Sequence, residues 1–420
     1  MSSPQANAAV AVPPMTREQR ANARNALIAG FLGWTLDAFD FFILVMVQDA
    51  IAKDFNRSLP AIAATLFATL AARPVGALIF GIMADRYGRR LPLMLDVIFY
   101  SVISVLCGLA PTYTIFFVLR LLFGICMGGE WGVGASLALE SVPPKWRGII
   151  SGLLQEGYAT GYLLAAAAYY FVFPHWGWRP MFFIGGLPAL LSLFIRAKVK
   201  EPEAWRQHRT DWNTYWRSTL SHWPRFLYLV LMMTFMVGIS HGTQDMYPNF
   251  LKKQLHFSIH LTSVITIVSM IGAILGGLIV GLSSDRIGRR RAMVISVLLA
   301  ICFIPLWAHA SAPPAVPSLY VILFGAFLMQ FMVQGAWGVV PAHINELSPG
   351  ELRGFFPGFA YQMGVLCASG IGYLESVIGE HLTYSQSLTY SMLVVMGIGA
   401  FVIWLGPEEK GIHFLKQGSS

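Results

Sequence analysis

Charged residues are scarce in this chain of 420 residues. Asp, Glu, Lys and Arg make up 12% of it, which is about half of the share in soluble proteins. Apolar residues make up 56%, and so few polar side chains could not cover that much apolar surface in water. The composition excludes a disordered chain and a coiled coil, argues against a soluble enzyme, and predicts an integral membrane protein.

Cysteine is also rare, which excludes several kinds of site. The four cysteines, at 107, 126, 302 and 367, lie inside apolar runs, and no CxxC pair is present, so we expect neither disulfides nor a metal site. The segment from His343 to Glu346 is not an HExxH motif, and the glycines at 128–134 do not follow a strand. We therefore expect no enzyme activity, no metal and no cofactor.

Long apolar runs dominate the rest of the chain. A helix needs about 20 apolar residues to cross the hydrocarbon core of a bilayer. Twelve runs meet this length, so the sequence predicts membrane spans at 26–50, 60–83, 91–110, 112–138, 147–173, 179–198, 225–250, 261–284, 291–310, 317–341, 353–378 and 387–406.

The basic residues are distributed unevenly between the two sides of these spans. The net charge is +8, but the 29 basic residues cluster in short loops, which argues against a nucleic-acid partner. The N-terminal region, the loops after even-numbered spans and the C-terminal region hold 22 of them, against five in the opposite loops. The positive-inside rule then places both termini in the cytoplasm. We expect a cytoplasmic tail at 1–25, a six-helix bundle at 26–198, a cytoplasmic linker at 199–224, a second bundle at 225–406 and a cytoplasmic tail at 407–420.

The two predicted bundles share a sequence pattern. The pattern GxxxDRxGRR occurs at 81–90 and returns at 281–290, and Trp131 and Glu140 return 206 residues later as Trp337 and Glu346. Two six-span halves with the same orientation are related by an axis along the membrane normal. Transporters built in this way bind their substrate near the midplane, between the halves.

On this repeated pattern the chain resembles the major facilitator superfamily over its whole length. The resemblance implies an all-α fold with 12 transmembrane helices in two pseudo-symmetric six-helix bundles. A role as a topology marker would explain the arginines of the pattern but not its aspartates. These can pair with an arginine or cap a helix end, so we interpret the loops as a conformational latch. The residues expected to gate are Gly81, Asp85, Arg86, Arg89, Asp285, Arg286 and Arg289.

Several ionisable residues lie inside the predicted spans, where each costs about 2.5–3.5 kcal/mol and marks a functional site by default. Asp37 and Asp40 lie three residues apart on the first span, and Arg73 lies on the second. Arg120 and Glu130 lie on the fourth, and alanines stand at the equivalent positions of the second half, so these charges indicate function more than packing.

The seventh span carries a polar cluster. His241, Gln244 and Asp245 fall on one helix face, which indicates that this face lines a cavity. The alternative is that His241 and Asp245 only satisfy each other inside the bundle. The segment resembles the [S/T]-H-x-[S/T]-Q-D motif of the Jen group of lactate and pyruvate:proton symporters, which share a branch with the sialate:proton symporters. Two positions depart from the Jen pattern, because Val237 replaces an Asn and Asn249 replaces a Thr, so the exact substrate does not transfer.

This resemblance implies a proton-coupled symporter that imports small monocarboxylates, such as lactate or pyruvate, by a rocker-switch mechanism. The matching Arg in the Jen group serves the substrate, so the expected substrate-binding residues are Arg73, His241, Thr243, Gln244, Tyr158 and Gln155. H⁺ is the coupling ion, and the proton-coupling candidates are Asp37, Asp40, Arg120, Glu130 and Asp245. Arg120 is expected to adjust the proton affinity of Glu130 or Asp37, and the sequence does not choose the proton carrier.

Other functions remain open on the sequence. A sialic acid:H⁺ symporter is the nearest, although the usual bacterial sialate carriers have extra central spans and the linker has 26 residues. A proton-coupled drug or metabolite exporter would have a more apolar cavity. A non-transporting nutrient sensor would carry a long signalling tail, and 14 residues follow Gly406. We expect a monomer in the plasma membrane (the inner membrane of a bacterium), with lipid and a small carboxylate as its partners.

Overall fold

The computed structural model describes residues 15–209, 211–309, 318–371, 375, 378 and 381–414. Across these residues the regular secondary structure is helical, with no β-strand. Parts of the predicted tails, at 1–14 and 415–420, and much of the end of the predicted span 353–378 lie outside the described residues.

The helices form two groups that are joined by a linker. The first half contains α1 (Arg17–Asp54), α2 (Leu59–Tyr87), α3 (Arg90–Leu109), α4 (Tyr113–Met127), α5 (Glu130–Glu140), α6 (Arg147–Gln155), α7 (Gly157–Phe171), α8 (Phe173–Trp176), α9 (Arg179–Ile184) and α10 (Ala189–Lys198). The linker contains α11 (Glu203–His208) and α12 (Trp212–Ser221). The second half contains α13 (Trp223–Gln244), α14 (Tyr247–Asn249), α15 (Ile259–Ile287), α16 (Arg289–Trp307), α17 (Leu319–Leu347), α18 (Phe356–Ala368) and α20 (Tyr384–Leu405).

Ten helical stretches of the described chain are long and apolar enough to cross a membrane. Two of the twelve predicted spans are missing from this set: the helix of one is interrupted, and part of the other lies outside the described residues. The predicted span 147–173 divides into α6 and α7, and the predicted span 353–378 is represented by α18, which ends at Ala368. Apolar runs predict that a segment lies in the membrane, but they do not predict where its helix breaks.

The break between α6 and α7 lies at Glu156. Its ψ angle of −8° is far from the value of about −42° of a regular helix. Beyond the break, Gly161 lets α7 lie directly on α1, because a Cβ at Gly161 would lie 2.2 Å from the carbonyl oxygen of Thr35. The break therefore turns Gln155 and Tyr158, which flank it, toward the centre of the molecule.

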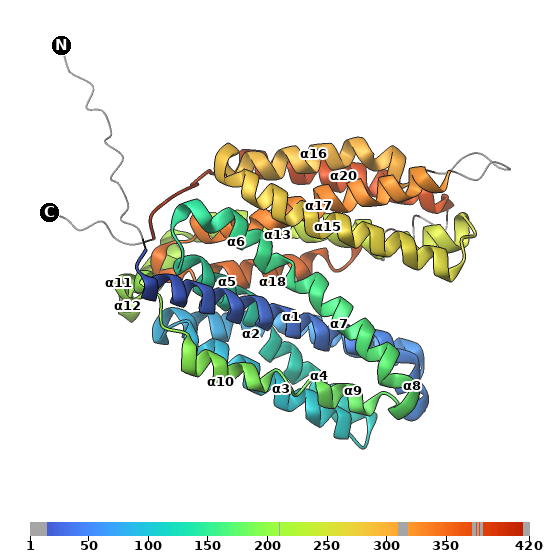
Figure 1. Ribbon diagram of the computed structural model, residues 1–420, viewed down its shortest axis with the longest axis horizontal. Helices are drawn as coiled ribbons and strands as arrows, with labels where there is room; N and C mark the ends of the chain where they lie inside the picture. Colours follow the sequence, from blue (N-terminus) through green and yellow to red (C-terminus); the bar gives the residue numbers. More distant parts are fainter. Residues whose placement is uncertain are drawn as a thin grey trace, which may run out of the picture.

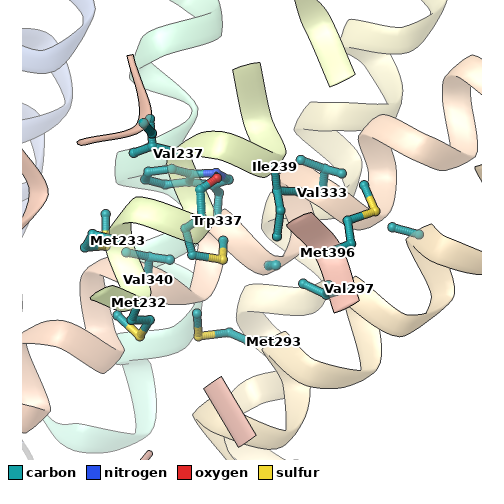
Figure 2. Packing of buried hydrophobic residues seen from close by; sticks show 14 of the residues in the cluster. Met232, Met233, Val237, Ile239, Met293, Val297, Val333, Trp337, Val340 and Met396 are labelled. Atoms are coloured by element: carbon teal, nitrogen blue, oxygen red, sulfur yellow. The ribbon is translucent and has the colours of Figure 1, made fainter. Parts of the chain in front are cut away.

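The core of the second half is rich in methionine. Met232, Met233, Met293 and Met396 are fully buried and belong to one cluster with Trp337 and with valine and isoleucine side chains (Figure 2). Unbranched, polarisable thioethers fill irregular gaps between helices. This packing fixes α13, whose polar cluster faces the centre of the molecule, against α17, α18 and α20.

The two halves approach each other most closely at the end where α11 and α12 lie, here called the linker end. Figure 1 shows the ribbons of the two halves converging at this end, on the left, and diverging toward the other. At the linker end α6 packs on α15 and α17, and α18 packs on α2 and α5. Glycine makes this approach possible, since a Cβ at Gly152 would lie 2.5 Å from the carbonyl oxygen of Gly277.

Candidate functional site

A cavity lies between the two halves and has two adjoining chambers. The wide chamber, of about 220 Å³, and the narrow chamber, of about 80 Å³, are both lined by residues of the first and the second half. The residues that line both chambers are Gln155, Tyr158, His241, Gln244 and Gln334. Four of these five residues, all except Gln334, are among the predicted substrate-binding residues. The cavity lies between the halves, where transporters built from two repeated six-helix halves bind their substrate.

The narrow chamber contains the ion pair between Arg73 and Asp37. The Arg73 Nη2 atom donates to Asp37 Oδ2 at 3.1 Å, and both side chains are almost completely buried. The Nε of Arg73 and the Oδ1 of Asp37 have no hydrogen-bond partner among the described residues. Gly128 of the first half lets α4 reach the main chain here, since a Cβ would lie 1.9 Å from the carbonyl oxygen of Arg73. The pair is thus rigidly held, neutral as a whole, and incompletely hydrogen-bonded.

The polar face of α13 reaches the cavity. His241 Nδ1 lies 3.2 Å from Asp245 Oδ2, and both side chains are nearly half exposed. His241 and Asp245 thus pair with each other, which is the alternative that the sequence analysis left open. They also line the wide chamber. Thr243 behaves differently, because its hydroxyl contacts the carbonyl oxygens of its own helix and its side chain is buried.

Two glutamines of α17 complete this polar wall, and the sequence analysis missed them. Gln244 Nε2 donates to Gln330 Oε1 at 3.2 Å, and Gln330 Nε2 donates to Thr243 Oγ1 at 3.1 Å. Gln334 Nε2 donates to Ser240 Oγ at 3.1 Å. Gln330 and Gln334 are four residues apart in an otherwise apolar span, and this spacing on one helix face is the signal that could have identified them.

Aromatic rings surround the narrow chamber from both halves. Tyr158 stacks on Trp34 with ring centroids 5.7 Å apart, and Tyr361 of the second half packs edge-on against Trp34 at 6.3 Å. Tyr361 also contacts Trp131 and Trp337, the two tryptophans of the sequence repeat. The Nε1 of Trp131 donates to the side-chain oxygen of Gln155 at 3.3 Å, which orients this amide. The rings form apolar walls around the Arg73–Asp37 pair.

Three of the predicted proton-coupling residues lie behind the cavity, inside the first half. Neither chamber is lined by Asp40, Arg120 or Glu130, and all three side chains are fully buried. Ser104 donates to Asp40 Oδ1 at 2.9 Å, and the Arg120 guanidinium lies over the ring of Phe123 at 4.1 Å.

Glu130 is more isolated than the other two. Its carboxyl oxygens have no hydrogen-bond partner in the part of the chain that the structure describes, and a Cβ at Gly33 of α1 would lie 2.0 Å from Oε1. No group of three or more His, Cys, Asp or Glu side chains among the described residues is placed to hold a metal ion.

The repeated GxxxDRxGRR loops lie at the linker end and connect the two halves. Asp85 of the first loop accepts hydrogen bonds from the main-chain N–H groups of Gly354 and Phe355, at 2.6 and 3.0 Å. It also pairs with Arg89 of its own loop at 2.7 Å. Gly81 allows this contact, because a Cβ there would lie 2.8 Å from the Cα of Phe355.

The second loop repeats the arrangement with fewer bonds. Asp285 accepts one bond across the interface, from the N–H of Gly148 at 3.0 Å, and pairs with Arg289 at 2.8 Å. Glu346 bridges Arg289 of its own half, at 3.0 Å, and Arg147 of the other half, at 3.3 Å. Arg86 and Arg286, the other predicted gating arginines, lie beside these contacts. The Arg86 guanidinium is over Trp212 at 5.2 Å, and the carbonyl oxygen of Arg286 accepts from Lys410.

Residues 407–414 also cross this interface. Figure 1 shows this dark red segment leaving the second half and reaching the first half at the linker end. Glu408 accepts from the main-chain N–H groups of Arg289 and Arg290, at 3.3 and 2.9 Å. At the end of the segment, the buried ring of Phe414 lies between the guanidinium groups of Arg147, at 3.3 Å, and Arg353, at 3.8 Å. The segment and both loops close the cavity from the linker end.

Asp85→Asn is expected to open the linker end more than Asp285→Asn. A hydrogen bond to a charged group contributes about 1.5–3 kcal/mol, so losing one of the two bonds across the interface would shift the population of the open form about tenfold. Asp285 accepts one main-chain hydrogen bond across the interface, whereas Asp85 accepts two, so replacing Asp285 is expected to have the smaller effect. Distances between spin labels at Tyr87 and Ile287, exposed in opposite halves, would report the shift. Equal label distances in both variants and in the unchanged protein would contradict this description of the latch.

Comparison with known proteins identifies a family for this architecture. The sequence model of the Major Facilitator Superfamily matches residues 29–245 and again residues 231–419. The two matches meet near the end of α13, so the family pattern extends over nearly the whole chain.

Individual relatives and one solved structure agree with this match. A carboxylic acid transporter protein homolog of Saccharomyces cerevisiae is 29% identical over 385 residues, 85% of this chain and 61% of that protein. The sialic acid transporter NanX of Escherichia coli is 30% identical over 381 residues, 89% of this chain and 90% of that protein. The proton:xylose symporter XylE has a structure that matches with a TM-score of 0.73 and 18% identity, over 94% of this chain and 98% of that one.

Proposed function

Since this chain belongs to the Major Facilitator Superfamily and is a multi-pass membrane transporter, we propose that it is a proton-coupled symporter that imports small monocarboxylates of the lactate and pyruvate type. One observation carries this proposal. A buried Arg73–Asp37 pair lies on the wall of the cavity between the halves, where a carboxylate needs a cation and a proton needs an acceptor.

Arg73 is the proposed binding group for the substrate carboxylate. A carboxylate that leaves water must replace its hydration with a cation and hydrogen-bond donors, and a guanidinium supplies several donors in one plane. Around Arg73, the side chains of Tyr158, Gln155, Gln244 and His241 share the walls of both chambers. They are the proposed donors to the substrate body. Thr243 has a supporting place, because its hydroxyl holds Gln330 in position.

Asp37 is the proposed proton carrier. In the empty transporter, Arg73 and Asp37 neutralise each other. When the substrate carboxylate takes the guanidinium, Asp37 is left buried without a cation and takes up a proton, so each bound anion is accompanied by one H⁺. The cavity has the same net charge in the empty and the loaded states. Both can therefore reorient in the membrane at a similar cost, which is the physical basis of symport.

The remaining buried charges have proposed supporting roles. Asp40, Arg120 and Glu130 lie inside the first half, behind the narrow chamber, where their charges adjust the proton affinity of Asp37. Asp245 stays paired with His241 in the wide chamber and keeps that imidazole oriented.

The proposed transport cycle opens and closes the two ends in turn. The structure is closed at the linker end by the loops around Asp85 and Asp285. The positive-inside distribution of Lys and Arg makes the linker end cytoplasmic in this proposal, so the closed form faces outward. Rocking of the halves would separate the loops and release the substrate and the proton into the cytoplasm.

Uptake competition tests the substrate class. Purified protein in liposomes would take up labelled lactate under an inward proton gradient, and an uncoupler would abolish the uptake. Excess unlabelled pyruvate is expected to block lactate uptake, and sialate is not. Absence of uptake of either acid, in protein shown to be folded, would overturn the carboxylate proposal and leave only the fold and family.

A sialic acid:H⁺ symporter is the second candidate. The wide chamber favours it, because amide side chains of Gln155, Gln244, Gln330 and Gln334 line a space larger than the narrow chamber. NanX also aligns with most of this chain. Competition by sialate but not by pyruvate would support this candidate over the monocarboxylate proposal.

A further inference from the structure

The linker helix α12 carries an apolar stripe that stays largely exposed in the described protein. Trp212, Trp216 and Leu220 are exposed by 40%, 46% and 74%, and they lie four residues apart on one helix face. The helix belongs to none of the membrane-spanning stretches, so spanning the bilayer does not explain this exposure. Two tryptophans and a leucine that line one face of a helix in a polar linker are expected to contact an apolar partner.

Beyond a break in the helix at His222, exposed apolar residues resume at the start of the membrane span α13. Trp223, at the start of α13, and then Leu227 and Leu231 are exposed at spacings of three and four residues from Leu220. The outer face of α13 is the face that a spanning helix presents to lipid. The partner of the α12 stripe is therefore expected to be lipid as well, at the depth where α13 leaves the membrane.

The charges beside the stripe fit the surface of an anionic membrane. Arg217 is exposed on the polar face of α12, and Arg209 is exposed just before the helix. The Arg86 guanidinium lies over the ring of Trp212 at 5.2 Å. The acid on this segment, Asp211, is engaged as the N-cap of α12, where it accepts from the N–H of Thr214 at 2.7 Å. Basic residues next to a tryptophan-rich apolar face are typical of helices that lie in a membrane interface.

We propose that α12 is a membrane-interface anchor. Its Trp212–Trp216–Leu220 stripe enters the boundary between headgroups and acyl chains on the linker side, and Arg217 and Arg209 bind the phosphate groups of anionic phospholipids. This inference does not depend on the identity of the transported substrate.

The buried face of the same helix gives this anchor a consequence for transport. Tyr215 donates to Asp85 Oδ2 at 3.2 Å, and Ser218 donates to Glu351 Oε1 at 2.5 Å. Asp85 belongs to the first half and Glu351 to the second, so α12 bridges the halves where the linker end is closed. Bound anionic lipid therefore stabilises the closed form of the linker end.

Lipid quenching of a fluorophore tests the anchor. A single cysteine replaces Leu220 on the stripe or Thr214, which is exposed on the opposite side of α12, in a background without the four native cysteines, and carries an environment-sensitive dye. In vesicles containing spin-labelled phospholipid, the dye at 220 is expected to be quenched several-fold more strongly than the dye at 214. Equal quenching at both positions would overturn the proposal.

Lipid binding to the arginines gives the second measurement. Phosphatidylglycerol is titrated into the detergent-solubilised protein, and bound lipids are counted by native mass spectrometry. R217Q is expected to weaken phosphatidylglycerol binding about fivefold, the ratio for one basic residue at an anionic surface. K252Q removes an exposed basic residue near α15 in the opposite loop and is expected to change nothing. Equal binding by R217Q and the unchanged protein would contradict the proposal.

Discussion

Replacing Arg73 with glutamine is expected to lower carboxylate uptake by about a hundredfold or more. Removing one partner of a buried ion pair costs about 3–5 kcal/mol, and every 1.4 kcal/mol is a factor of ten in binding. The substrate loses its cation, because no other Arg or Lys of the described residues lines the narrow chamber. The measurement is initial uptake of labelled lactate by proteoliposomes, with protein folding checked by thermal unfolding.

The chain offers a matched control for this substitution. Arg179 pairs with Asp54 at 3.0 Å in the same half, but this pair is about 40% exposed and lines neither chamber. Arg179→Gln is expected to change uptake little, since an exposed ion pair contributes about 0–1 kcal/mol. A double variant, R73Q with D37N, removes the orphaned carboxylate and separates loss of binding from misfolding. Near-normal uptake by R73Q would contradict the proposed role of Arg73.

Replacing Asp37 with asparagine is expected to separate substrate movement from the proton gradient. Asparagine has the shape of the carboxylic acid but neither takes up nor releases a proton. Exchange of internal for external lactate should persist within about tenfold, because Arg73 remains and asparagine resembles the protonated Asp37 side chain of the loaded form. Accumulation driven by an inward proton gradient should disappear.

The corresponding control is Asp54→Asn, which removes the carboxylate of the exposed pair with Arg179. It should retain gradient-driven accumulation. If D37N still accumulated lactate in response to the gradient, the proton carrier would be another carboxylate. Asp40 and Glu130 would then be the next residues to replace, because both are fully buried in the first half.

Much of the fold could be predicted from the sequence because membrane helices have a strong and simple signal. Apolar runs identified the spans, and the repeated GxxxDRxGRR pattern identified the superfamily that the family match confirms. The helix breaks were missed. Gln155, Glu156 and Gly157 lie inside the predicted span 147–173, yet the helix breaks at Glu156, where α6 packs on the second half and α7 packs on α1.

The candidate site was only partly predictable. Helical spacing placed His241, Gln244 and Asp245 on one face, and this face does line the cavity. Spacing along one helix does not show which residues of other helices its side chains contact, so it did not show that Arg73 on α2 pairs with Asp37 on α1. For the same reason it did not separate Asp37, at the cavity wall, from Asp40, one turn further along α1 and held by Ser104 behind it.

The central claim is that one proton moves with each carboxylate through the Arg73–Asp37 site, and a simultaneous flux measurement tests it most directly. Proteoliposomes containing a pH-sensitive dye would be given lactate outside without an imposed gradient, and internal acidification and labelled lactate uptake would be recorded together. The account predicts equal initial rates of proton and lactate entry in the unchanged protein. For D37N it predicts no acidification, and entry of labelled lactate only when the vesicles hold unlabelled lactate to exchange. Lactate entry without acidification in the unchanged protein would contradict it.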